Sequence, residues 1–427
     1  MLGHLAIDQS PHSDRHELNR LGSRSPIVRA LAVLLVVLLI AKDASHLGDR
    51  FIMRGLVQAA CLFYGVFWLM THVEGNLVRR YLVVFAYILV LSVSSCLSDY
   101  FEFSAWQVLS LVSVITFGVA VCEGHGTSNV PQTILRATGI TYLVVCVLSI
   151  AGIWLMHDVV YDTSGAGGAR FCGIFGKPGM MGSASGILLG IALFGGCKWR
   201  HFNRTYQLIA ALAALSCLAL TGARTFWVAA AVAAVIVSWF YLQNRFKVYG
   251  AVSALVGFVV LLAAIGDYKV SQPTQNEILR TESIENLSGR TGVWAEAMTR
   301  LGERPWFGYG FGAGGIGAVV DFGAVASSTP AWSTVPTLHD GYVQSLMDSG
   351  MVGTALYGLV IGMAVFRMMV RDKRKKHGAE CFALVFLAVG NVGESVIFTA
   401  STFPSILFWY VAILAFSLRR NAGHEIS

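Results

Sequence analysis

Long uninterrupted apolar runs constrain this chain more than any other feature of its sequence. Runs such as 27–41, 81–97, 104–122 and 226–242 are near or above the roughly 17 to 20 apolar residues that cross a hydrocarbon core. Because no water inside a bilayer can satisfy a bare backbone, such segments must be helical. Only 13% of the residues are charged, against roughly 25% in soluble domains. The sequence therefore predicts an all-α, polytopic membrane helix bundle.

Hydropathy predicts about twelve transmembrane helices, with one large loop between spans nine and ten. The predicted spans are 27–41, 56–73, 81–97, 104–122, 135–155, 179–197, 205–222, 226–243, 248–265, 350–370, 380–396 and 402–418. The predicted organisation is a retained N-terminal tail (1–26), helices one to nine (27–265), the loop (266–349), helices ten to twelve (350–418) and a C-terminal tail (419–427).

The basic residues predict the orientation of the spans, because short cytoplasmic loops collect Lys and Arg. With the N-terminus inside, 20 of the 31 basic residues fall on inner loops or tails. They are Arg15, Arg20, Arg24, Arg29, Arg79, Arg80, Arg136, Lys198, Arg200, Arg204, Arg245, Lys247, Arg367, Arg371, Lys373, Arg374, Lys375, Lys376, Arg419 and Arg420. We therefore expect both tails in the cytoplasm and the loop 266–349 in the periplasm.

Three features that could suggest other functions have plainer explanations. The net charge of +7 does not indicate nucleic-acid binding, because the basic residues lie between apolar spans rather than on one exposed face. Seven of the eight cysteines lie in or beside spans, so we predict no disulfide framework. Gly310, Gly312 and Gly315 match GxGxxG, but no strand precedes them. We interpret this glycine-rich stretch as close backbone packing or as a flexible gate over a cavity.

Three predicted outer segments stand out, namely 156–178, the turn 221–225 and the loop 266–349. A loop as long as the third is usually functional. Within it, residues 288–304 predict an amphipathic helix that ends before Pro305. The outer segments contain no HxxxH, no HExxH and no clustered carboxylates, so we predict no metal site.

The ionisable residues of these segments near the membrane surface are Arg170, Lys177, Arg224, Arg290, His339 and Asp340. An arginine in the tight turn at Arg224 should face a cavity and bind an anion, although snorkelling to a lipid headgroup is the alternative. Arg290 stands where the dipole of the loop helix also attracts anions, although a plain surface arginine is the default interpretation of this residue alone. His339 can accept a proton near neutral pH, although a lone loop histidine can also be incidental.

A series of outer motifs resembles the O-antigen ligase and polymerase superfamily. The motifs are Arg170-Phe-Cys-Gly-Ile-Phe-Gly-Lys-Pro178, Thr221-Gly-Ala-Arg224, Ser288-Gly-Arg-Thr-Gly-Val-Trp294, Arg304-Pro-Trp-Phe-Gly-Tyr-Gly310, His339 and Asp348-Ser-Gly-Met-Val-Gly353. They cover residues 165–355, and the topology extends the resemblance to the whole chain. The residue after the family's histidine is often Asn, whereas this chain has Asp340.

The resemblance implies a metal-independent membrane glycosyltransferase that uses a lipid donor and no cofactor. By that resemblance, Arg224 and Arg290 hold the diphosphate of an undecaprenyl diphosphate-linked glycan, and His339 activates the acceptor hydroxyl. Arg170 matches a further family arginine, and we also expect Lys177 and Asp340 to contact substrate. The protein would lie in a bacterial inner membrane, with a flippase and chain-length or export proteins as candidate partners.

Three functions remain open at this stage. Polymerisation of exopolysaccharide or O-antigen repeat units is favoured, because residues 305–312 look closest to exopolysaccharide-production members of the family. A ligase that transfers glycan to lipid A core or to protein would use the same donor and residues. A flippase or transporter is the third alternative, with Glu394 and Asp348 as candidate proton or substrate sites.

Overall fold

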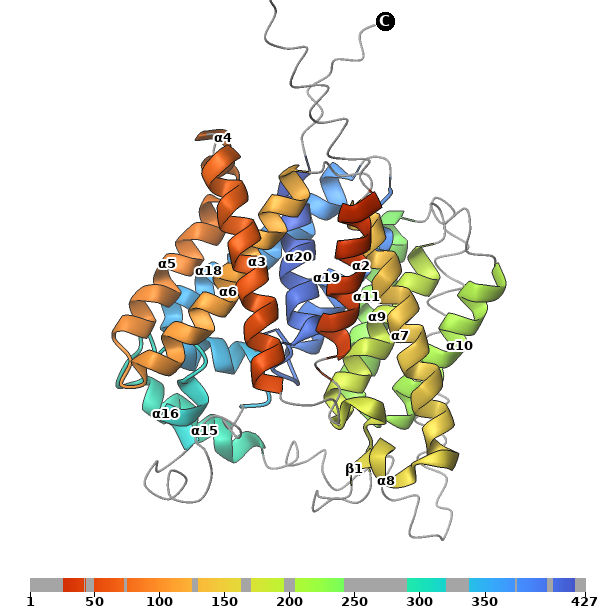
Figure 1. The fold of residues 1–427 in the computed structure, drawn as a ribbon. Helices are drawn as coiled ribbons and strands as arrows, with labels where there is room; N and C mark the ends of the chain where they lie inside the picture. The colour runs from red at the N-terminus through yellow and green to blue at the C-terminus, as the bar shows by residue number, and fades with distance from the viewer. Residues whose placement is uncertain are drawn as a thin grey trace, which may run out of the picture.

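The protein is a bundle of helices in the computed structural model (Figure 1). The structure describes residues 26–41, 43, 50–72, 75–124, 130–162, 170–195, 204–241, 290–319, 338–372, 375–397 and 402–418. The helices are α2 (Pro26–Ala41), α3 (Arg50–His72), α4 (Gly75–Arg80), α5 (Leu82–Cys96), α6 (Phe101–Gly124), α7 (Val130–Leu155), α8 (His157–Val160), α9 (Pro178–Phe194), α10 (Arg204–Leu220), α11 (Arg224–Tyr241), α15 (Arg290–Leu301), α16 (Gly314–Val319), α18 (Gly341–Arg371), α19 (Gly378–Gly390) and α20 (Phe403–Ser417). A hairpin of β1 (Tyr161–Asp162) and β2 (Arg170–Phe171) and a 3-10 turn, η1 (Gly173–Phe175), complete the described elements.

The predicted membrane character is confirmed, while the number of spans stays a prediction. Five described helices are long and apolar enough to cross a membrane: Gly55–His72, Phe101–Gly124, Val130–Leu155, Arg224–Tyr241 and Gly341–Arg371. Five more apolar helices are shorter, namely Leu82–Cys96, Pro178–Phe194, Arg204–Leu220, Gly378–Gly390 and Phe403–Ser417. The predicted ninth span, 248–265, lies outside the described residues.

The predicted outer segments gather at one end of the bundle. The elements α8, β1, α15 and α16 lie at that end, and α4, which ends in Arg79 and Arg80, lies at the other (Figure 1). We call the first the loop end. This arrangement agrees with the predicted orientation, because the basic helix α4 and the long loop lie at opposite ends. Which end faces the periplasm stays a prediction.

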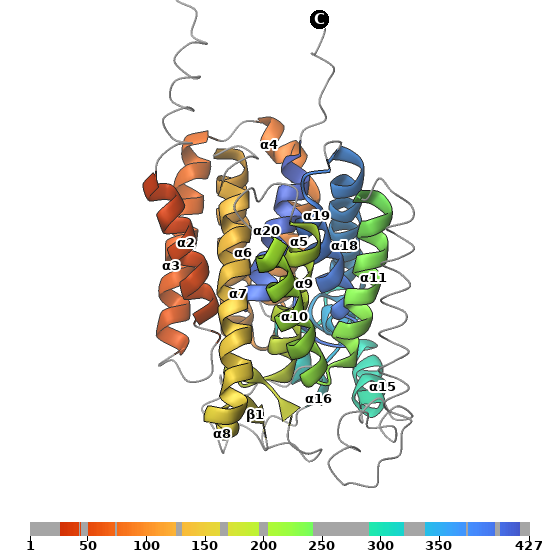
Figure 2. The same ribbon diagram turned by 90° about the vertical axis from the view of Figure 1, so that its right-hand side faces the viewer.

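The centre of the bundle is held by close packing of glycines against aromatic rings. Helix α9 presents Gly186 and Gly190 to helix α19, where a Cβ added at either glycine would overlap the ring of Phe386 or Phe382. Small residues let helix backbones approach closely, which is a principal source of helix association in lipid. The views in Figures 1 and 2 place α9, α19 and α20 among the other helices.

Helix α18 begins at Gly341, whereas the sequence predicted a span from residue 350. The additional residues form a separate first segment, because Gly350 has non-helical dihedrals (φ 64°, ψ −168°) and breaks the helix. Such a positive φ favours glycine, which lacks a Cβ. The break therefore divides α18 into a short segment at the loop end and a longer apolar one.

Candidate functional site

His339 lies in the short connection that leads into α18 at the loop end. Its backbone is left-handed, with φ 54°, and its side chain is 54% exposed. Its Nδ1 is 3.8 Å from Oε2 of Glu394, whose side chain is 26% exposed. The imidazole is therefore accessible from outside the bundle and has a carboxylate beside it.

Asp340 caps α18 rather than pointing away from the protein. Its Oδ1 accepts hydrogen bonds from the backbone N–H groups of Tyr342 at 2.8 Å and Val343 at 3.0 Å. Asp is a preferred residue at this position, because the first N–H groups of a helix have no partner within it. The structure thus gives Asp340 a local role in fixing the residue next to His339, and its expected substrate contact stays a prediction.

Glu394 follows α19 and lies beside two predicted outer segments and beside the start of α9, the helix that follows the third. The preceding Asn391 accepts a 2.7 Å hydrogen bond at its carbonyl from the N–H of Gly341, which joins this segment to the start of α18. Gly393 packs so tightly against Thr225 that an added Cβ would overlap it. A Cβ added to Gly179 would lie 3.4 Å from Oε2 of Glu394. The carboxylate therefore lies beside His339 and close to the starts of α9 and α11.

Arg224 is the first residue of α11 and is partly buried. The turn before it depends on Gly222, whose φ is 60°, and the N–H of Arg224 donates to the carbonyl of Gly222 at 3.0 Å. Its neighbour Thr225 is the residue that touches Gly393. Gly393 thus contacts the residue next to Arg224, and Glu394, the next residue along the chain, lies beside His339. This segment places the start of α11 and His339 in the same region.

The other predicted basic residues have less defined positions relative to His339. Lys177 is exposed at the N-cap of α9, two positions before Gly179. Arg170 is exposed on β2, where its backbone pairs with that of Asp162 on β1. Arg290 is the first residue of α15, and its side chain lies outside the described part of the structure.

The sequence makes Glu394 a candidate proton or substrate site of a transporter and does not place it beside His339. Its position near the end of a predicted apolar span suggested a transport site, and nothing in the local sequence linked it to a histidine 55 positions earlier (394 − 339). A usable signal was available, because a carboxylate at the outer end of a span is costly unless it has a partner or faces a cavity.

The glycine-rich stretch after α15 forms a strap, which we define as residues 305–310, across the break in α18. The N–H of Met351 donates to the carbonyl of Pro305 at 2.8 Å, and the N–H of Tyr309 donates to the carbonyl of Met347 at 2.8 Å. A Cβ added at Gly350 would overlap the backbone of the strap. The prediction of close backbone packing is therefore confirmed here, and the strap supplies partners that a broken helix would otherwise lack.

Side chains of the loop and of the turn after α5 reinforce the strap. Ser98, in that turn, donates to the carbonyl of Tyr309 at 2.5 Å. The hydroxyl of Tyr309 donates toward Glu303 at 2.9 Å, and burial, together with this hydrogen bond, raises the pKa of Tyr309 to about 12. The phenol therefore stays protonated near neutral pH. Arg304 stacks on the same ring, with its guanidinium carbon 5.2 Å from the ring centroid, and pairs with Asp99 at 2.8 Å.

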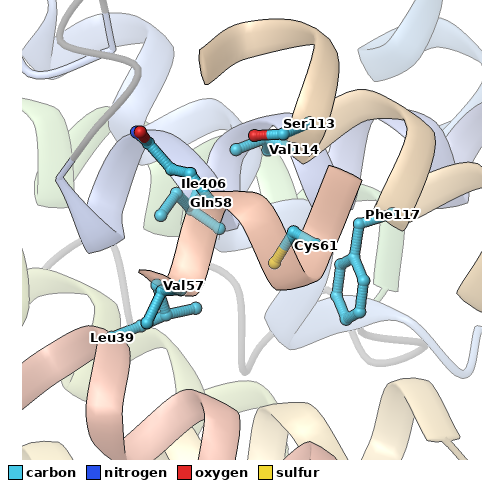
Figure 3. Close-up of a pocket in the computed structure, with 8 residues that line it drawn as sticks. All are labelled: Leu39, Val57, Gln58, Cys61, Ser113, Val114, Phe117 and Ile406. Carbon is cyan, nitrogen blue, oxygen red and sulfur yellow. The ribbon is translucent and has the colours of Figure 1, made fainter. Parts of the chain in front are cut away.

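A separate apolar hollow lies between α2, α3, α6 and α20, away from these residues (Figure 3). Gln58 is the polar amide among the residues that line it. Neither amide atom of Gln58 has a hydrogen-bond partner among the residues that the structure describes. The hollow shares no residue with the region around His339, so the two are distinct features of the protein.

Two predicted basic residues stand at the starts of α11 and α9, the helices that begin close to Glu394. Arg224 and Lys177 are cationic, and a planar guanidinium binds phosphate oxygens in a bidentate manner without losing its charge. Within the described ranges, no group of three or more His, Cys, Asp or Glu residues could hold a metal ion. The arrangement offers a proton acceptor beside a carboxylate, with an arginine at the start of a nearby helix.

Residues 209–358 of this chain match the family model described as O-antigen ligase. The matched segment contains Arg224, Arg290 and His339, whereas Glu394 lies beyond its end. A search of curated proteins gave no match.

Proposed function

We propose that this chain, a member of the O-antigen ligase and polymerase superfamily, transfers glycan from an undecaprenyl diphosphate donor to a sugar hydroxyl. The observation that carries the proposal is the approach of His339 Nδ1 to within 3.8 Å of Glu394, near the start of the helix that bears Arg224. A proton acceptor and a phosphate-binding cation at one end of a membrane protein suit a lipid-linked, anionic donor.

His339 acts as the general base in this proposal. The acceptor oxygen attacks the anomeric carbon and forms the new glycosidic bond, while the bond from that carbon to the diphosphate breaks and its electron pair leaves with the diphosphate. The hydroxyl proton passes to the imidazole. Glu394 orients the ring and stabilises the imidazolium that forms, in the way that a carboxylate supports a catalytic histidine in hydrolases. The distance of 3.8 Å shortens to a hydrogen bond when substrate binds.

Arg224 and Arg290 hold the leaving diphosphate. Negative charge develops on this group in the transition state, and fixed guanidinium groups stabilise such charge. Arg170 and Lys177 guide the anionic donor from the exposed surface, and Asp340 contacts the sugar from its position beside His339. The energy for transfer is stored in the donor, so the reaction needs no nucleotide and no metal. Chelation with EDTA should therefore leave the rate of the purified protein unchanged.

The reaction takes place at the periplasmic face of a bacterial inner membrane in this proposal. The chain spans the membrane about twelve times, with both tails in the cytoplasm. A flippase delivers the lipid-linked repeat unit, and chain-length or export proteins receive the product. Polymerisation of exopolysaccharide or O-antigen repeat units is the activity we favour. Ligation to lipid A core is the second candidate, because the matching family model is described as O-antigen ligase.

Analysis of lipid-linked glycans after deletion of the gene tests this function. Single repeat units on the lipid carrier at the periplasmic face would support polymerisation, and full-length polymer on the carrier would support ligation. Accumulation of lipid-linked units at the cytoplasmic face would instead indicate a flippase and would overturn the proposal. Complementation with the wild-type gene and with His339→Ala separates loss of the reaction from loss of the protein.

A further inference from the structure

The backbone of His339 adopts a conformation that needs support from its surroundings. Its φ of 54° lies in the left-handed region, which residues other than glycine rarely occupy. Conformations of this kind persist only where neighbouring groups fix the chain. Asp340, on the C-terminal side, is fixed at the cap of α18. The residue on the N-terminal side, Leu338, must therefore also be held.

Leu338 is held through both of its backbone polar groups. Its N–H donates to Oε1 of Gln344 at 3.2 Å, and its carbonyl accepts from Nε1 of Trp294 at 2.9 Å. Its side chain is 1% exposed and packs with Ala297 and Met347. The position of His339 is thus set by one residue of α18 and by one residue of α15.

The two contacts join the histidine connection to α15 directly and to α16 through Gln344 and Asp348. Trp294 stands four residues after Arg290, the first residue of α15. Gln344 in turn donates from Nε2 to Oδ1 of Asp348 at 2.7 Å, and the same oxygen accepts from the N–H of Gly314 in α16 at 2.8 Å. A displacement of α15 would therefore act directly on the residue before His339.

We propose that Trp294 is a positioning residue, whose indole N–H holds the Leu338 carbonyl and thereby sets His339 for proton transfer relative to the helix that begins with Arg290. This inference rests on the proposed function of His339 as the base. In this inference the indole acts through its N–H group, and not only by filling space in the loop. The consequence is that donor binding to α15 and the placement of the base are mechanically linked.

Trp294→Phe isolates the hydrogen bond, because phenylalanine keeps an aromatic ring in the same place and removes the N–H. Purified protein is assayed with undecaprenyl diphosphate-linked repeat units for release of undecaprenyl diphosphate. We expect kcat per folded molecule to fall by about 10- to 100-fold, since a small misplacement of a reacting group costs up to about 10²-fold, while the donor KM changes less than about 3-fold. Trp306→Phe is the matched control, because that side chain is 61% exposed in the same loop. It should keep wild-type kinetics.

A double mutant distinguishes action through His339 from any other effect. If Trp294 acts through the base, Trp294→Phe should not lower the residual rate further in a His339→Ala background. Wild-type kcat for Trp294→Phe, or a full additional loss in the double mutant, would overturn the inference. A fully active His339→Ala variant would instead overturn the proposed base, whatever Trp294→Phe does. Melting temperatures measured for each variant show whether it is folded at the assay temperature, so that the rates of folded proteins are compared.

Discussion

The centre of the bundle and its loop end are built on different principles. Between α9 and α19, glycines meet phenylalanine rings, and the fit depends on volume. Around His339, the connection is held by two hydrogen bonds to the backbone of Leu338, whose carbonyl accepts from Trp294 and whose N–H donates to Gln344. A substitution in the first region should remove the folded protein, whereas one in the second should remove the activity of a protein that still folds.

Gly186→Leu should have the largest effect, because the larger side chain would disrupt the packing between α9 and α19. A Cβ at this position already overlaps the ring of Phe386, and overpacking a dense core costs about 1–3 kcal/mol or more. We expect little folded protein in membrane extracts by fluorescence-detected size exclusion. Adding Phe386→Ala should restore part of it, because the ring that obstructs the leucine is gone. Normal amounts of the single variant would contradict the close packing described for this pair.

Arg224→Ala and Arg290→Ala should reduce turnover to near background while the protein folds normally. Each substitution removes a guanidinium group that stabilises negative charge on the leaving diphosphate. The loss of one such hydrogen-bond donor group typically lowers the rate by about 10²- to 10³-fold. Arg→Lys should lose most of the activity too, because a point ammonium cannot form the bidentate contact. Arg371→Ala, at the far end of α18, is the control. Wild-type polymer from either alanine variant would refute the diphosphate role.

His339→Ala should lower turnover by roughly 10²- to 10⁴-fold, the usual contribution of a positioned general base. Affinity for the lipid donor should stay near the wild-type value, because the histidine acts on the acceptor. Equilibrium binding of the donor to purified variants separates this effect from that of Arg224→Ala, which should weaken binding. A His339→Ala variant that loses donor binding but keeps its turnover would show that His339 binds the donor and is not the base.

The same contrast explains what the sequence could predict. Apolar runs determine where helices form, and the described helices overlap all the predicted spans except 248–265, which lies outside the described residues. The break at Gly350 was missed, because it is supported by a strap whose hydrogen bonds to the helix join residues 38 (347 − 309) to 46 (351 − 305) positions apart. Glu394 was missed as a partner of His339 for the same reason. Periodicity reports local structure, and contacts distant in sequence leave little trace in it.

Glu394→Gln should have a smaller effect than the loss of the histidine. The amide keeps the size of the side chain and removes the charge that stabilises the imidazolium, so the base remains but works less well. We expect kcat to fall by about 10-fold, because a carboxylate 3.8 Å from the ring and 26% exposed is screened by water. Glu394→Asp should fall between wild type and Gln. A Gln variant as active as wild type would remove Glu394 from the mechanism.

Asp340→Asn should have the smallest effect, because asparagine caps a helix about as well as aspartate. Its side-chain oxygen can accept the hydrogen bonds from Tyr342 and Val343 that Asp340 accepts at 2.8 and 3.0 Å. We expect turnover within about 2-fold of wild type, whereas Asp340→Ala should destabilise the protein by about 0.5–2 kcal/mol through loss of the cap. Thermal unfolding and turnover of both variants measure the two effects. An inactive but stable Asp340→Asn variant would show that the charge itself acts on substrate, and Asp340 would then replace His339 as the candidate base.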